Sequence, residues 1–362
     1  MSDFFEFDFI KLESSKSADA ITMRYSSNGR TYIHITDGGY QDSGENIIEH
    51  IDSYYNSPSV IDSVVITHPD GDHAGGIIKI LENYKVSELW MLCPWNYADE
   101  IIDRFKRYTN VDNLKQKLKE IYPNIATLEE IANNKGIVIY EPFQNNKIGP
   151  FIVTAPTKSR YLELIVSSVK TPDEIIEDLS FSNIMTTFLS ESVKKAASIV
   201  RAAWGEEYFP EEGTSNENEM SVIQFTELFD EKILLTGDAG RDALNETIEY
   251  LQSIDIVLPG IDRIQVPHHG SRHNVSSEIL DNLLGKRLEE KPKENDDKFT
   301  AIISASDNDD DHPRKSVIRA FIHRGAKVYT TEKSTLQSHY KAPKRDGWSG
   351  ANKLDYPEEQ EE

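Results

Sequence analysis

The chain is poor in cysteine, in basic residues and in long hydrophobic runs, and each shortage excludes a class of protein. Its 362 residues include a single cysteine, Cys93, which cannot form an internal disulfide and suits a buried apolar position. No apolar run approaches the roughly 20 residues that span a bilayer. The N-terminal segment 1–6 is acidic where a signal peptide is basic. We therefore expect a cytoplasmic protein that does not enter a membrane.

Acidic residues outnumber basic ones by 62 to 39, and the formal net charge of −23 repels nucleic acid from the average surface. Segment 312–345 is the exception, because nine Lys or Arg residues there accompany one acid, Glu332, for a local charge of +8. Beside a functional site, such a segment would steer a phosphate-bearing ligand to one face. Alternatively, its cations pair with acidic neighbours.

One short stretch concentrates side chains that bind divalent metal ions. Its ligand candidates are His68, Asp70, Asp72 and His73. They directly follow the apolar run 64–66, so a strand that ends there presents them together at one edge of a sheet, and two glycines then let the backbone turn away. Two carboxylates and two imidazoles this close repel one another or stay hydrated unless a cation gathers them. The stretch therefore predicts a metal site for two ions, and hence a hydrolase.

The spacing His-x-Asp-x-Asp-His resembles the His-x-His-x-Asp-His signature of the metallo-β-lactamase fold, with Asp70 in place of the second His. Five further blocks occur in the same order as in the soluble hydrolase domain of the DNA-uptake protein ComEC. They cover residues 18–39, 218–222, 233–238, 266–271 and 308–313. The chain therefore resembles that domain over roughly residues 18–332.

The resemblance implies a four-layer αββα metallo-β-lactamase sandwich, of class α/β (α+β), over residues 1–345. Where the resembled family is shorter, the pattern indicates a helical insertion at about 159–217. This insertion could be a lid, a docking surface for a protein partner or a contact for self-association. Residues 346–362 are acidic again, and we expect a disordered tail.

The strands and helices follow from hydrophobic periodicity and turn residues. Strands are expected at 21–25, 32–36, 64–67, 89–92, 138–140, 151–154, 222–225, 232–236, 263–266, 300–304 and 327–330. Helices are expected at 46–55, 75–84, 99–121, 242–252 and 276–287, and from 311–313 onward, with helices of the insertion at 162–166, 173–179 and 191–204.

The resemblance also assigns metal ligands. These are His68 and Asp70 for the first ion, Asp72 and His73 for the second, Asp238 as a bridge, and one of His268 and His269 to complete the second site. Asn218 stands in a block where many relatives carry a third His for the first ion. Fewer nitrogens and more oxygens favour harder ions, so Mn²⁺ or Mg²⁺ competes with Zn²⁺. Asp37 is expected to support the ligands from behind rather than to bind metal.

Catalysis in the resembled family implies a hydroxide that bridges two ions and attacks a phosphodiester. Asp72, His312 and Asn218 are the expected catalytic residues. His312 is expected at a helix N-terminus, where it could protonate the leaving group and the backbone amides could bind an anion. The expected substrate-binding residues are Ser271, Asn308, Arg314 and Lys315. The aspartate-rich run 307–311 departs from the family pattern and could bind another cation or repel a phosphate.

The leading hypothesis is a two-metal phosphodiesterase that cleaves nucleic acid, a nuclease for which the resemblance implies a role in bacterial antiviral defence. The alternative is a small-molecule hydrolase acting on a cyclic nucleotide, a phosphoester or a lactone. A second alternative is a metal-stabilised binding subunit of a complex. Salt separates the first two, because a nuclease that uses the cations of 312–345 should lose affinity steeply as salt rises.

Overall fold

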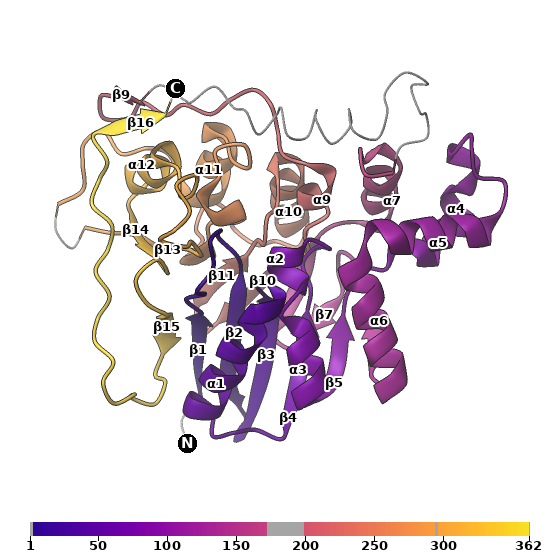
Figure 1. Ribbon diagram of the computed structural model, residues 1–362. Coiled ribbons are helices and arrows are strands. Elements are labelled where there is room, and N and C mark those ends of the chain that lie inside the picture. Colours follow the sequence, from indigo (N-terminus) through magenta and orange to yellow (C-terminus); the bar gives the residue numbers. More distant parts are fainter. Residues whose placement is uncertain (1–2, 172–198, 294–295, 362) are drawn as a thin grey trace.

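The computed structural model describes residues 3–171, 199–293 and 296–361. Within these ranges the chain forms two seven-stranded sheets and a separate two-stranded ribbon (Figure 1). No described helix combines the length and the apolar character needed to cross a membrane.

The first sheet has the strand order β15-β1-β2-β3-β4-β5-β6. Its strands are β1 (Phe4–Phe9), β2 (Ala20–Ser27), β3 (Arg30–Gly38), β4 (Val60–Val65), β5 (Lys85–Trp90), β6 (Val138–Tyr140) and β15 (Leu336–Tyr340). The pairs β15–β1, β1–β2 and β2–β3 are antiparallel, whereas β3 to β6 run parallel.

The second sheet has the order β14-β13-β12-β11-β10-β8-β7. Its strands are β7 (Lys147–Ile148), β8 (Phe151–Ala155), β10 (Ile223–Leu228), β11 (Glu231–Leu235), β12 (Arg263–Gln265), β13 (Phe299–Ile303) and β14 (Ala326–Thr330). Strands β11 to β14 run parallel. Both sheets are thus mixed, with a parallel half and an antiparallel half.

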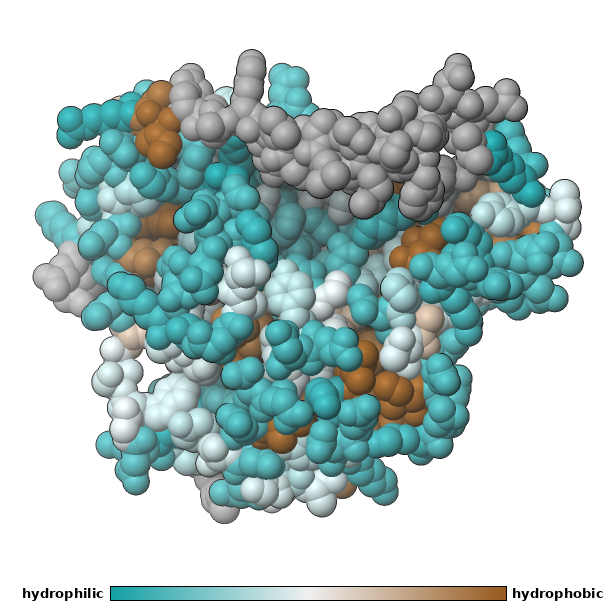
Figure 2. Space-filling model, viewed as in Figure 1, coloured by the Kyte–Doolittle hydropathy of each residue, from teal (hydrophilic) through white to brown (hydrophobic). Residues whose placement is uncertain are grey.

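Helices cover the outer face of each sheet (Figure 1). The helices are α1 (Gly44–Tyr54), α2 (Gly71–Ala74), α3 (Ile77–Asn83), α4 (Ala98–Ile101), α5 (Val111–Ile121), α6 (Pro123–Lys135), α7 (Lys158–Ser167), α9 (Asn216–Glu219), α10 (Arg241–Ser253), α11 (Ser277–Leu284) and α12 (Lys315–His323). α1, α3, α5 and α6 share one apolar core with β3 to β5, and α10, α11 and α12 share another with the second sheet. The outward surface over α1 and α3 is largely hydrophilic, as Figure 2 shows.

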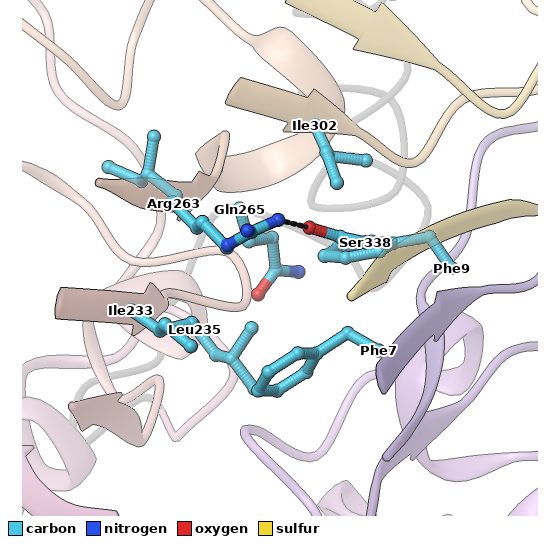
Figure 3. Close-up of a pocket in the computed structure, with 9 residues that line it drawn as sticks. Phe7, Phe9, Ile233, Leu235, Arg263, Gln265, Ile302 and Ser338 are labelled. Atoms are coloured by element: carbon cyan, nitrogen blue, oxygen red, sulfur yellow. Dashed lines mark hydrogen bonds between the residues drawn. The ribbon is translucent and has the colours of Figure 1, made fainter. Parts of the chain in front are cut away.

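The inner faces of the two sheets meet in a third apolar cluster (Figure 3). Phe7 and Phe9 of β1 lie there with residues of β11, β12 and β13 around a cavity of about 10 Å³. Such a cavity is about the size of a single water molecule, so the interface is closely packed. Arg263 of β12 crosses it and donates to Ser338 Oγ of β15 at 2.6 Å. Helix, sheet, sheet and helix therefore form the expected four-layer αββα sandwich.

Two parts of the first half differ from the expectation. Strand β1 was not expected, because Glu6 and Asp8 interrupt its apolar residues; both are buried and are paired with Arg24 and Arg345. The expected helix over 99–121 is broken: its first part ends before Phe105, and Asn110 begins α5 by accepting bonds from two backbone N–H groups. Helix α6 and strand β15 were not expected either.

The C-terminal segment, expected to be a disordered tail, is folded as far as Glu361. Strand β16 (Glu359–Glu361) pairs with β9 (Ile199–Arg201). The Glu361 carboxylate accepts hydrogen bonds from the backbone N–H groups of Lys315 and Ser316, at 3.0 and 3.1 Å, and so caps the first turn of α12. The acidic composition of the segment therefore provides a partner for a helix N-terminus, where negative charge is favourable.

Only part of the expected insertion can be compared with the structure. Helix α7 covers the helix expected at 162–166, whereas the helix expected at 173–179 and most of that at 191–204 lie outside the described residues. Residues 199–201 form a strand instead of a helix. Beyond it, the side chain of Glu207 is buried and pairs with Arg324 of the second half. Deleting residues 160–210 would therefore remove contacts of the sandwich itself.

Candidate metal centre

Four imidazoles gather around the carboxylate of Asp238 at the carboxyl ends of the parallel strands. His68 follows β4, His73 lies in α2, and both His268 and His269 lie in the turn after β12. Asp238 follows β11, and its side chain is buried. β4 belongs to the first sheet and β11 and β12 belong to the second, so strand ends of the two packed sheets meet here and bring together residues about 200 positions apart in the chain.

Each ring is held through its Nδ1 atom. The contacts are His73 to Asp37 Oδ2 (2.8 Å), His269 to the Ser304 carbonyl (3.0 Å), His268 to Asn274 Oδ1 (2.9 Å) and His68 to Thr67 Oγ1 (3.1 Å). An Nδ1–H that donates in this way leaves the lone pair on Nε2, the form of imidazole that binds a metal ion. The structure therefore orients four Nε2 atoms as potential ligands.

The two oxygens of Asp238 divide these rings into two pairs. Oδ1 lies 3.2 Å from His73 Nε2 and 3.8 Å from His269 Nε2. Oδ2 lies 3.5 Å from His268 Nε2 and 3.9 Å from His68 Nε2. The sequence left open which residue of the His268–His269 pair points inward, and the structure directs each toward a different oxygen. Both have positive φ, 47° and 54°, which turns neighbouring side chains to the same side.

Two further carboxylates adjoin the rings. Asp72 Oδ2 lies 3.7 Å from His269 Nε2 and 4.0 Å from His73 Nε2. Asp19 is fully buried, and its Oδ2 lies 3.8 Å from Nδ1 of both rings. Asp19, His73, Asp238 and His269 each offer a ligand atom within 4.8 Å of the others. Asp19 was not among the expected site residues; its only signal was its place in the first block of the resemblance.

The buried polar atoms of this cluster test whether a cation fits. Those without a hydrogen-bond partner in the described part of the chain include Nε2 of His68, His73 and His269, Oδ1 of Asp238 and both carboxylate oxygens of Asp19. Each such atom costs about 1–3 kcal/mol if it stays unsatisfied. A cation among them would supply the missing partner. The mixed nitrogen and oxygen donors fit a divalent ion such as Zn²⁺ or Mn²⁺.

The carboxylates also change the protonation of the rings in the absence of a cation. Burial lowers the pKa of His269, but Asp238 and Asp19 outweigh it and raise this pKa to about 9. Asp238 and Asp37 likewise raise the pKa of His73 well above its usual range, against the effect of burial. The pKa of Asp238 is well below its usual value despite burial, because His73 and His268 lie beside it. Protons thus supply the positive charge that the carboxylates attract.

Asp70, expected to bind the first ion, has a different partner. Its Oδ1 accepts a hydrogen bond from Lys170 Nζ at 2.8 Å, and both side chains are about one-third exposed. Lys170 lies 100 residues further along the chain, just after α7. On the side of Asp238 Oδ2, His68 and His268 are therefore the nitrogen donors closest to the bridge.

His312 lies beside the cluster but not at a helix N-terminus. Its ring centre is 5.5 Å from that of His268. The expectation of a helix starting there was wrong, because α12 begins only at Lys315, with Arg314 as its N-cap. His312 Nδ1 instead lies 3.4 Å from Asp309 Oδ2. The same oxygen accepts a bond from the backbone N–H of Ser17, so the carboxylate is fixed from two sides.

The remaining expected site residues lie around this centre with protein partners. Asn218 lies beside His268, with its Nδ2 3.2 Å from the His268 Nδ1, and donates to Thr214 Oγ1 at 2.7 Å. Asn308 donates to the Ser14 carbonyl, and Ser271 is buried in the turn that follows His269. Arg314 and Lys315 form ion pairs with Asp311 and Glu359. The loop 307–311 thus presents Asp309, rather than Asn308, to His312.

The basic segment 312–345 does not form a free cationic face. Five of its nine cations pair with carboxylates: Arg314, Lys315, Arg324, Lys327 and Arg345. A sixth, Arg319, is fully buried and donates to the carbonyls of Ala203 and Pro357. Of the two hypotheses for this segment, a cationic face that steers a ligand and pairing with acidic neighbours, the second therefore describes most of its cations.

Asp37 lies behind the rings. Its Oδ1 accepts from the backbone N–H of Thr67 at 2.8 Å, and its Oδ2 accepts from the Thr67 hydroxyl at 2.6 Å and from His73 at 2.8 Å. Because Thr67 in turn contacts His68, one carboxylate orients two of the four imidazoles.

The solved structures to which this chain is similar resemble it distantly. No protein-family model matches the chain, and no curated protein matches its sequence. Among solved structures, a putative metallo-β-lactamase from Thermotoga maritima is 11% identical, with a TM-score of 0.27, over 66% of this chain and 79% of that one. A β-lactamase domain protein from Burkholderia ambifaria is 13% identical, with a TM-score of 0.33, over 72% of this chain and 67% of that one. A metallo-β-lactamase from Hirschia baltica is 12% identical, with a TM-score of 0.30, over 77% of this chain and 90% of that one.

These likenesses are too distant to inform the substrate. The sheet order and the residues at the strand ends define the class: a four-layer αββα sandwich with a His/Asp cluster suited to divalent metal ions. None of the three structures is described as a ComEC protein, so that finer resemblance stays a prediction.

Proposed function

We propose that the chain is a metal-dependent hydrolase that binds two divalent ions and cleaves a phosphodiester. One observation carries the proposal: Asp238 has a pair of imidazole Nε2 atoms within 3.9 Å of each of its oxygens. A single buried ion would need only one such pair of imidazoles, on one oxygen of the carboxylate. Two groups on opposite oxygens of one carboxylate support two ions with Asp238 as the bridge.

The donors divide accordingly. His73, His269 and Asp72 would hold one ion with Asp238 Oδ1, and His68 and His268 would hold the other with Asp238 Oδ2. Bound ions would activate a water molecule and neutralise charge on a phosphoryl oxygen. The outer side chains fix the rings in the tautomer that leaves Nε2 free for metal, so little rearrangement would be needed on binding.

His312 is the residue that would protonate the leaving group. Its Nδ1 faces Asp309, which leaves Nε2 as the nitrogen for proton transfer. Burial lowers the pKa of His312 despite the nearby Asp309, so the imidazole readily gives up a proton once it has one. Asp309 is itself held by Ser17 and Lys16, which fixes the direction of the ring.

Two substrate classes fit the phosphodiesterase proposal. Nucleic acid follows from the resemblance of the motif blocks. A small phosphodiester is the second candidate, favoured by a specific observation: most cations of 312–345 are paired or buried, so they do not form a track for a polyanion. Affinity that falls steeply between 50 and 200 mM salt would favour nucleic acid, and affinity nearly independent of salt would favour the small substrate.

The experiment loads metal-free protein with Zn²⁺, Mn²⁺ or Mg²⁺ and offers linear and circular DNA, RNA, cyclic nucleotides, a chromogenic phosphodiester and a lactone. We expect two equivalents of metal and turnover of a phosphodiester that Asp72→Asn lacks. Turnover of the lactone alone would replace the phosphodiesterase proposal with another hydrolase. A loaded protein without turnover would favour a binding subunit, and a protein that takes up no ion would refute the proposal.

A further inference from the structure

Lys170 places an ammonium group at the rim of the metal centre. Its Nζ donates to Asp70 Oδ1 at 2.8 Å. Asp70 is the residue immediately before α2, the short helix that carries Asp72 and His73. The ammonium is therefore joined by a single residue to the helix that supplies two of the proposed ligands. Its side chain is 36% exposed, so a bound ligand can reach it.

The loop that carries Lys170 is anchored to the centre. Ser168 Oγ accepts from the backbone N–H of Lys170 at 3.0 Å and donates to Glu217 Oε1 at 2.6 Å. Tyr122 OH donates to the same oxygen at 3.0 Å. Glu217 is buried in α9, directly before Asn218, which contacts the His268 ring. One short helix thus anchors the lysine loop and also lies beside one imidazole of the cluster.

The ammonium keeps its charge, and its donors are not all used by the described residues. Burial lowers the pKa of Lys170, but Asp70 and Glu217 outweigh it and raise this pKa above its usual value. An ammonium has three N–H donors, and Asp70 is its hydrogen-bond acceptor among the described residues. Two donors remain for another acceptor. A partly exposed ion pair contributes only about 0–1 kcal/mol to stability, so stability alone gives little reason for a lysine here.

We propose that Lys170 binds an anionic oxygen of the substrate, on the Asp70 side of the metal centre. This inference rests on the proposed function and narrows it: the substrate carries a negative charge next to the bond that is cleaved, as a phosphodiester does and a lactone does not. Asp70 orients the ammonium and leaves the His68 and His268 side of the bridge to the nitrogen ligands. The cation comes from the segment of the expected insertion, just after α7.

The test measures binding without turnover, so that it stays informative even if the catalytic proposal fails. Inorganic phosphate is titrated into the metal-loaded protein by calorimetry, for wild type, Lys170→Met and Lys170→Arg. Lys158→Met is the matched control, because Lys158 begins α7, the helix that precedes the Lys170 loop, and its ammonium also pairs with one carboxylate, that of Glu100, at a distance of 2.7 Å. Metal content is measured by mass spectrometry for each protein.

We expect Lys170→Met to bind phosphate about 10- to 100-fold more weakly than wild type, as loss of a charge-assisted hydrogen bond predicts. Lys170→Arg should keep most of the affinity, and Lys158→Met all of it, with equal metal content throughout. Wild-type phosphate affinity in Lys170→Met would overturn the inference. So would loss of metal from that variant, since the lysine would then serve the metal centre rather than the ligand. Phosphate binding through Lys170 in a protein without turnover would uphold the inference while the catalytic proposal fell.

Discussion

Replacing Asp37 with Asn should weaken metal binding without unfolding the protein. The Asp37 carboxylate accepts three hydrogen bonds, from the Thr67 N–H, the Thr67 hydroxyl and the Nδ1–H of His73. An amide offers one oxygen and one NH₂ group in the same space, so at least one of these donors must face another donor. If the NH₂ group faces His73, the ring has to carry its proton on Nε2 and loses the lone pair that would bind metal.

The backbone makes Asn the appropriate replacement. Asp37 has a φ of 59°, in the left-handed region, and Asn adopts that conformation more readily than other residues with side chains. An Ala variant would add backbone strain to the loss of the acceptor. Changes of this kind behind a metal-binding His weaken metal affinity about 10- to 100-fold. That corresponds to about 1.4–2.7 kcal/mol of binding free energy.

The assay is calorimetric titration of Zn²⁺ or Mn²⁺ into metal-free wild type and Asp37→Asn, with circular dichroism to check the fold. Asp62→Asn is the control, because Asp62 belongs to β4 of the same sheet and also accepts from a backbone N–H, that of Ile33, at 2.9 Å. The control should bind metal as wild type does. A metal affinity of Asp37→Asn within twofold of wild type would refute the reasoning, since the ring would then not depend on this carboxylate.

Four further outcomes are expected. Asp72→Asn should keep the fold and lower turnover by more than about 100-fold, because a direct ligand should matter more than its support; wild-type rates would contradict its role. In the metal-free protein the pKa of His269 is raised to about 9. The bound proton therefore stabilises the folded state fully below about pH 6.5, and this stabilisation is lost as the pH rises to about 9. Urea unfolding should show the free energy of unfolding falling by up to about 3 kcal/mol over that range. Metal binding should accordingly release protons and strengthen from pH 6 to 9, and a flat affinity would argue against these rings as ligands. Arg345→Met should lower the free energy of unfolding by up to about 3–5 kcal/mol, because buried Asp8 and Glu6 lose the guanidinium that they share and keep His50 and Arg24, whereas exposed Lys344→Met should change it little.

Much of the fold could be predicted from the sequence. Most strands and helices appear within a few residues of their expected positions, because apolar periodicity and glycine turns are local properties. Strand β1 was not predicted, because Glu6 and Asp8 are typical of solvent-exposed positions in the sequence. Their partners, Arg24 and Arg345, lie in other segments and are brought beside them only by the fold. The fold of the C-terminal segment was not predicted for the same reason. Its acidic composition indicates disorder, and the contact of Glu361 with the N-terminus of α12 is formed only in the folded chain.

The surroundings of the expected ligands were harder to predict. Asp70 has the spacing of a metal ligand, but Lys170, 100 residues later, takes its carboxylate. Asp19 and Asp309 carry no local pattern, and each acquires its place only where strand ends converge. The nine cations of 312–345 count as a basic segment along the chain, yet their partners lie in other segments that neutralise most of them in space.

The sequence by itself determined that this chain forms a mixed αββα sandwich and clusters metal-binding side chains after β4, because periodicity and ligand spacing are written into consecutive residues. Only the tertiary structure decided which side chains face one another. Whether His268 and His269 share one oxygen of Asp238 or divide between two depends on backbone angles and on the meeting of strands β4, β11 and β12. Charges interact through space rather than along the chain. The partners of Asp70, His312 and the basic segment could therefore be identified only in the folded structure.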